Sequence, residues 1–66
     1  MSDTSSYFVY RILPSAGTPE FSVYPSCSTW TECTYFARAF PLVVARLLVN
    51  RLEKKNTPYI YGYVEA

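Results

Sequence analysis

The sequence predicts a small α+β domain with the element order β-β-α-β, and three observations support this prediction. Two short segments, residues 7–13 and 21–24, show an alternating pattern and flank a loop that contains Pro and Gly. A long stretch, residues 30–55, repeats apolar residues at spacings of three and four. A final aromatic segment covers residues 59–64. The chain of 66 residues is long enough for a single domain, 1–66, with a thin core.

Aromatic and β-branched residues make residues 7–13 (YFVYRIL) the first predicted strand. Side chains alternate along a strand, so one face is expected to carry Phe8, Tyr10 and Ile12, and the other Tyr7, Val9 and Arg11. Residues 14–19 predict a loop, because Pro stands at both ends and Gly17 lies inside. Residues 21–24 predict a second strand, which forms a hairpin with the first. Residues 1–6 are polar and are expected to fray.

Residues 30–55 predict one long helix. Thr29 and Glu32 match a capping box, in which each side chain accepts a hydrogen bond from a free backbone N–H at the helix start. An apolar stripe follows at helical spacing, formed by Cys33, Phe36, Ala37, Phe40, Val44, Leu47 and Leu48. Pro41 interrupts this stripe, because proline lacks the N–H that a helix interior needs. Either the helix is kinked at Pro41, or a second helix starts there with Pro at its first position.

The last predicted strand, residues 59–64 (YIYGYV), is expected to lie beside the first strand and antiparallel to it. This gives a three-stranded antiparallel sheet of order 2-1-3, packed on the long helix. Ile60 and Val64 would share one face of the last strand, and its tyrosines the other. We expect the helix to cover the face that carries Phe8, Tyr10, Ile12, Phe21, Val23, Ile60 and Val64.

The residue types present argue against catalysis and metal binding, and no cofactor is expected. The chain has no His, the residue most often used for general acid–base chemistry. Its single Asp, Asp3, lies in the polar start, and its four Glu residues fall in different elements. Cys33 has no His that could activate it. Cys27 and Cys33 cannot supply four zinc ligands, and we expect free thiols in a reducing compartment, although a disulfide is geometrically conceivable.

Tyrosines gather on the sheet face that we expect to lie opposite the helix. Tyrosine is tolerated on a solvated sheet face, but it is also enriched where proteins bind one another. The number of aromatic side chains on this face favours a contact surface. The predicted partner-binding residues are Tyr24, Tyr59, Tyr61, Tyr63 and Arg11.

The second half of the predicted helix is apolar over much of its circumference, because Leu42, Val43, Ala45, Val49 and Leu52 lie off the main stripe. Either a kink at Pro41 redirects this surface, or it packs against a second copy of the chain. Basic side chains form a second candidate surface in the same segment, made of Arg46, Arg51, Lys54 and Lys55.

The polar start (MSDTSS), the compact β-β-α-β pattern and the lack of catalytic residues make the chain similar to the small phage-encoded inhibitors called anti-CRISPRs. The resemblance covers the whole chain. It implies a domain without a cofactor that binds a host CRISPR effector and blocks target DNA binding or cleavage. Anti-CRISPRs share no common motif, so the resemblance assigns no site residue. The net charge of +1 argues against a DNA-mimic mechanism.

The expected function is therefore that of a non-enzymatic protein-binding inhibitor, of the anti-CRISPR kind that targets a type I effector complex. The alternatives are a small nucleic-acid-binding or transcriptional regulator, or a phage structural or assembly protein. Direct nucleic-acid binding is not expected, because the net charge is only +1. A membrane partner is not expected, because the longest apolar stretch, residues 41–49, is interrupted by Arg46 and is shorter than the roughly 20 residues that a membrane helix needs. We expect a monomer or homodimer in the cytoplasm of a host bacterial cell.

Overall fold

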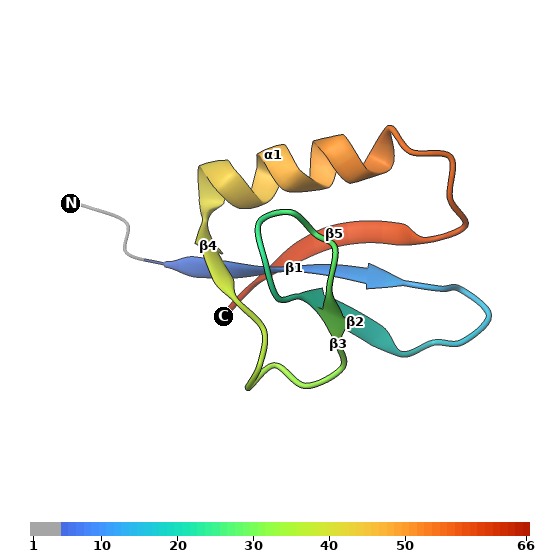
Figure 1. Ribbon diagram of the computed structural model, residues 1–66, viewed down its shortest axis with the longest axis horizontal. Helices are drawn as coiled ribbons and strands as arrows, with labels where there is room; N and C mark the ends of the chain where they lie inside the picture. Colours follow the sequence, from blue (N-terminus) through green and yellow to red (C-terminus); the bar gives the residue numbers. More distant parts are fainter. Residues whose placement is uncertain (1–4) are drawn as a thin grey trace.

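The computed structural model describes residues 5–66 as an antiparallel sheet with one helix (Figure 1). The α+β class is confirmed, but the expected order β-β-α-β is wrong, because two strands were missed. The elements are β1 (Ser6–Ile12), β2 (Pro19–Ser22), β3 (Trp30–Thr31), β4 (Ala39–Pro41), α1 (Leu42–Glu53) and β5 (Ile60–Glu65). No helix in this part of the chain is long and apolar enough to cross a membrane.

Strand β1 is the centre of the sheet, and every pairing is antiparallel. Along one edge β1 pairs with β5, and along the other it pairs first with β4 and then with β2. Strand β3 extends the sheet beyond β2. The sheet therefore has five strands, in the order β3-β2-β1-β4 with β5 on the remaining edge of β1. The predicted three-stranded sheet of order 2-1-3 is wrong in both strand number and order.

Residues 30–41, expected to be helical, form two short strands and the loop between them. Trp30 pairs with Ser22, and Phe40 pairs with Tyr7. These pairings decide the local structure because Trp, Thr, Tyr and Phe are weak helix formers but favour strands. The capping box predicted from Thr29 is absent for the same reason.

Helix α1 begins directly after Pro41, which ends β4 and stands at the N-cap with φ −58° and ψ 154°. Proline suits this boundary because it has no N–H that would lack a partner at the helix start, and because its ring prevents the helix from extending toward the N-terminus. Of the two-helix alternative, only the second helix is present, and it begins at Leu42 and not at Pro41. The single kinked helix is wrong. Arg51 lies in the last turn, where a cation complements the helix dipole.

Helix α1 covers the sheet face that carries Val9, which is the face opposite to the predicted one. The buried core consists of Val9, Phe40, Ala45, Leu48, Val49 and Leu52. Tyr7, Trp30 and Tyr61 pack against this core from the same face. Three residues of the predicted stripe, Cys33, Phe36 and Leu47, are exposed instead. The alternating pattern assigned the side chains of β1 and β5 to the correct faces, but the helix packs on the face of Val9 and not on the face of Phe8 and Tyr10.

The expected fraying of residues 1–6 lies partly outside the described residues, which begin at Ser5. For Ser5 and Ser6, which are described, the expected fraying is wrong. Ser6 belongs to β1 and pairs with Pro41. The Ser5 hydroxyl donates a hydrogen bond of 2.7 Å to a carboxylate oxygen of Glu65, which ties the first described residue to β5.

Candidate functional site

The sheet face away from helix α1, which we call the open sheet face, is mostly apolar, and the strands formed by residues 5–66 place no charged side chain on it. The strand registers place on it the large side chains of Phe8, Tyr10, Ile12, Pro19, Phe21, Ile60 and Val64, together with Thr31, Ala39 and Gly62. Ile60 and Val64 are exposed, and the Phe8 and Phe21 rings meet edge to face at 5.8 Å. The charged residues of β1 and β2, Arg11 and Glu20, alternate to the opposite face.

A shallow hollow of about 290 Å³ lies in the open sheet face. Its lining comes from three adjacent strands and consists of Tyr10, Ile12, Pro19, Phe21 and Val64. Tyr10 pairs with Gly62, and a Cβ placed on that glycine would stand 2.5 Å from the Tyr10 hydroxyl oxygen. The Tyr10 ring therefore lies over the Gly62 backbone, where any larger residue would obstruct it. The glycine thus helps to shape one wall of the hollow.

On the face that α1 covers, Arg11 is held between two aromatic rings. Its guanidinium carbon lies 4.6 Å from the Trp30 ring centroid and 4.4 Å from that of Tyr59. Its Nε atom donates a hydrogen bond of 2.8 Å to a Glu20 carboxylate oxygen. Tyr61 continues the cluster, 6.3 Å from Trp30 between ring centroids. The cluster joins β1, β2, β3 and the start of β5, so its geometry is that of a structural contact.

The predicted partner-binding tyrosines do not form one uncovered surface. Tyr61 is half-buried against the core, and Tyr59 is half-buried beside Arg11. Tyr63 is partly exposed, with its ring edge to face with Tyr7 at 5.8 Å. Tyr24 is exposed on the loop between β2 and β3. The structure brings Tyr59, Tyr61 and Arg11 together, but it places them on the helix side of the sheet.

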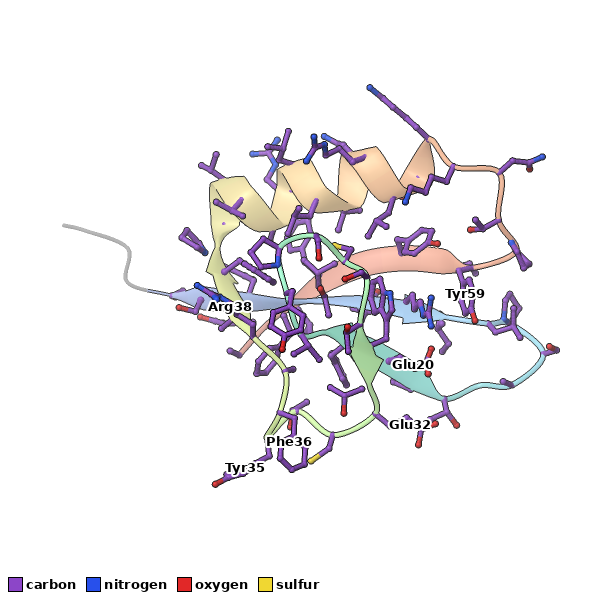
Figure 2. The ribbon with its side chains drawn as sticks, viewed as in Figure 1. Glu20, Glu32, Tyr35, Phe36, Arg38 and Tyr59 are labelled. Atoms are coloured by element: carbon purple, nitrogen blue, oxygen red, sulfur yellow. The ribbon has the colours of Figure 1, made fainter. Side chains whose placement is uncertain are left out.

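An exposed aromatic pair, Tyr35 and Phe36, was missed at the sequence level. The two rings meet edge to face at 5.3 Å and are 87% and 65% exposed as residues. Figure 2 shows them at the outer end of the loop between β3 and β4, pointing away from α1. The run of Thr and aromatic residues from 29 to 36 is a poor helix sequence, and that signal could have identified a loop here.

The predicted basic surface follows α1 but is divided between two hollows. Arg51 and Lys55 line a hollow next to the β2–β3 loop, whose walls include Cys27 and Leu52. Arg46 lines another on the outer side of the helix. Lys54 caps the helix C-terminus. These cations are all exposed, so they can reach an anionic partner without any rearrangement of the fold.

The two cysteines are free thiols and lie in different environments. Cys27 is half-buried in the loop between β2 and β3, with a positive φ of 56°, and its carbonyl accepts a hydrogen bond of 3.0 Å from the Trp30 indole N–H. Cys33 is exposed, not buried in a helix as expected. No cluster of three His, Cys, Asp or Glu residues that could hold a metal ion occurs within residues 5–66.

No protein-family model matches the sequence, and neither curated proteins nor solved structures include a significant match to the chain.

Proposed function

We propose that the chain acts by binding another protein through the open sheet face, as a non-enzymatic inhibitor. One observation carries the proposal: five half-buried or exposed side chains line a hollow in a face that α1 leaves uncovered, and none of them is charged. Contiguous apolar surface of this kind marks protein-interaction sites on small domains. The contact surface in this proposal therefore differs from the predicted tyrosine set.

A protein partner fits this surface better than a nucleic acid. Binding to a phosphate backbone requires several Lys or Arg side chains on the contact face, and the described strands place none on the open sheet face. Its aromatic rings also pack against one another, as Phe8 does with Phe21, so they do not form free platforms on which bases could stack. The proposed target is a type I CRISPR effector complex, and this part of the proposal rests on the resemblance to anti-CRISPRs in size and in the lack of catalytic residues, because the β-β-α-β layout was wrong.

The test is inhibition of target DNA binding by a purified type I effector complex. We expect the chain to bind the complex and to reduce its DNA binding, and the Ile12→Lys variant to lose both effects. Ile12 lines the hollow, whereas Leu47 is exposed on the outer side of α1, so Leu47→Lys is the matched control. A folded Ile12→Lys variant that still inhibits would exclude the open sheet face as the contact surface. A chain that binds no effector would refute the anti-CRISPR assignment.

A nucleic-acid-binding regulator is the second candidate, and the exposed cations of α1 favour it. Arg46 and Arg51 lie in α1, Lys54 and Lys55 follow it directly, and Glu53 is the one acid within residues 42–55. Affinity for nucleic acid that falls steeply between two salt concentrations, and falls again in an Arg51→Gln/Lys55→Gln variant, would support this function. Inhibition of the effector that persists in that variant would favour the protein-binding function instead.

A further inference from the structure

We propose that two copies of the chain join through their β5 strands, antiparallel about a twofold axis at Gly62, and so form one continuous sheet. The inference goes beyond the proposed function, because it concerns an edge of the sheet and a second copy of the chain. Three features of β5 support it: an edge that no described strand occupies, a sequence that is self-complementary about Gly62, and the absence of Lys, Pro and a bulge along the strand.

Strand β5 has one unpaired edge in the part of the chain that the structure describes. It pairs with β1 from Ile60 to Glu65, and no other strand formed by residues 5–66 pairs with it. The Ala66 N–H donates to the Ser6 carbonyl at 2.8 Å, which sets the alternation of hydrogen bonds along this pair of strands. Residues of an antiparallel strand point their backbone groups alternately toward each neighbour. The N–H and C=O groups of Tyr61 and Tyr63 therefore point out of the sheet at the unpaired edge.

The sequence of β5 is nearly palindromic about Gly62, since it reads Ile60-Tyr61-Gly62-Tyr63-Val64. An antiparallel pairing centred on Gly62 would set Tyr61 opposite Tyr63 of the second copy, with both backbone hydrogen bonds formed. Ile60 would stand opposite Val64 of the second copy, on the open sheet face. Aromatic pairs and pairs of β-branched residues are favourable across antiparallel strands. A twofold axis uses the same patch on both copies, so this self-matching sequence favours a second copy over an unrelated strand.

Strand β5 also lacks three of the features by which proteins prevent edge pairing, namely Lys, Pro and a bulge. Edge strands are usually protected by Lys, by Pro, by a bulge or by a covering segment. Residues 60–65 contain neither Lys nor Pro, and the register with β1 runs from Tyr7↔Glu65 to Ile12↔Ile60 without a bulge. The one charged residue, Glu65, lies at the end of the strand. Ile60 and Val64 are 55% and 47% exposed, so the apolar side chains beside the edge are available for pairing.

The pairing would place the two helices on one side of the combined sheet and the two open sheet faces on the other. Ile60 and Val64 of both copies would then connect the open sheet faces across the axis. Pairing of single strands is marginal in water, so the added apolar contacts are expected to contribute much of the stability of the dimer. The dimer should accordingly be concentration-dependent.

The experiment compares two double variants that differ only in the charge at position 64. In Ile60→Lys/Val64→Lys, each Lys stands opposite a Lys of the second copy, and directly opposed like charges are destabilising. In Ile60→Lys/Val64→Glu, the same pairing sets Lys opposite Glu. Within one chain the two positions are about 13 Å apart along the strand, so the charges affect the monomer similarly. The exposed Val43→Lys on α1 is the control for adding a charge elsewhere.

Analytical ultracentrifugation of the full chain gives the result. We expect a reversible dimer for the unaltered chain and for Val43→Lys, and a dissociation constant at least about tenfold higher for the Lys/Lys variant than for the Lys/Glu variant. The proposal is overturned if the unaltered chain remains monomeric up to about 1 mM, or if the two double variants associate equally.

Amide exchange of the unaltered chain tests the same edge without any substitution. The Tyr61 and Tyr63 amides are expected to be protected at high protein concentration and to exchange faster on dilution, because their N–H groups meet the second copy. Exchange of these two amides that does not change with concentration would contradict pairing through β5, even if the chain dimerises by another surface.

Discussion

Removing the Arg11 guanidinium tests whether the aromatic cluster on the helix side holds the fold together. We consider Arg11→Met, which keeps a long apolar side chain but deletes the charge and the planar group. Arg11 contacts the Trp30 and Tyr59 rings at 4.6 and 4.4 Å and pairs with Glu20 at 2.8 Å. These contacts connect three strands and the residue just before β5, so their loss should lower the free energy of unfolding of the whole domain.

The magnitude follows from the exposure of the cluster. The Arg11 and Glu20 side chains are 24% and 30% exposed, so the contacts are partly desolvated. Each cation–π contact then contributes about 0.5–1 kcal/mol, and the ion pair about 0.5 kcal/mol. The expected loss is about 2 kcal/mol, against a total of about 3–10 kcal/mol for a chain of 66 residues. The corresponding fall in Tm is about 8–16 °C.

The assay is urea unfolding followed by the fluorescence of Trp30, the single tryptophan of the chain. Because Arg11 contacts the Trp30 ring, the native emission should change in Arg11→Met before any denaturant is added. Arg11→Lys should recover part of the stability, since it keeps the charge but not the planar stack. Glu20→Gln should cost about 0.5 kcal/mol, an effect that shrinks at high salt.

The matched control is Arg46→Met, which removes an exposed cation from α1 and should change the free energy of unfolding by less than about 0.5 kcal/mol. An Arg11→Met variant that is as stable as this control, with unchanged Trp30 emission, would refute the reasoning. In that case the ring contacts would be incidental to the packing of β1 under the helix.

Two further predictions concern packing on the two faces of the sheet. Gly62→Ala should lower the free energy of unfolding by about 1 kcal/mol, because the added Cβ displaces the Tyr10 ring. In a Tyr10→Ala background the same change should leave the free energy of unfolding unaltered. Equal costs in both backgrounds would contradict the close approach of Tyr10 to Gly62. Phe40→Ala should lower the free energy of unfolding, measured in urea, by about 3 kcal/mol or more, because Phe40 is buried. Phe36→Ala, on the exposed loop, should lower it by less than about 0.5 kcal/mol. Similar losses in the two variants would favour the predicted helical stripe over the observed strands.

Part of the candidate site could be predicted from the sequence, because strand alternation is a local property. The pattern in residues 7–13 and 59–64 grouped Phe8, Tyr10, Ile12, Ile60 and Val64 correctly on one face. It could not decide which face the helix covers, because both faces of β1 are apolar and aromatic. That choice depends on the buried helix residues, which pack on Val9. The open sheet face was therefore predicted as core, and the tyrosines as surface.

The segment from residue 30 to residue 41 shows the second limit. Its capping-box match and apolar spacing are local features, and they indicated a helix. Trp30 pairs with Ser22, and Phe40 pairs with Tyr7 near the other end of the chain. The helical spacing within residues 30–41 contains no information about partners that lie outside this segment. Pro41 correctly indicated an interruption of the predicted helix, because a residue without an N–H, whose ring clashes with the preceding turn, does not fit inside a helix.

The sequence by itself determined the α+β class and the alternating faces of β1 and β5, and it marked Pro41 as an interruption without deciding between a kink and a helix start. Each of these follows from backbone geometry over a few neighbouring residues. Only the tertiary structure decided the number and order of strands, the face that α1 covers and the unpaired edge of β5. These depend on which distant segments bury the most apolar surface together while their backbone groups remain paired, and the whole chain contributes to that balance.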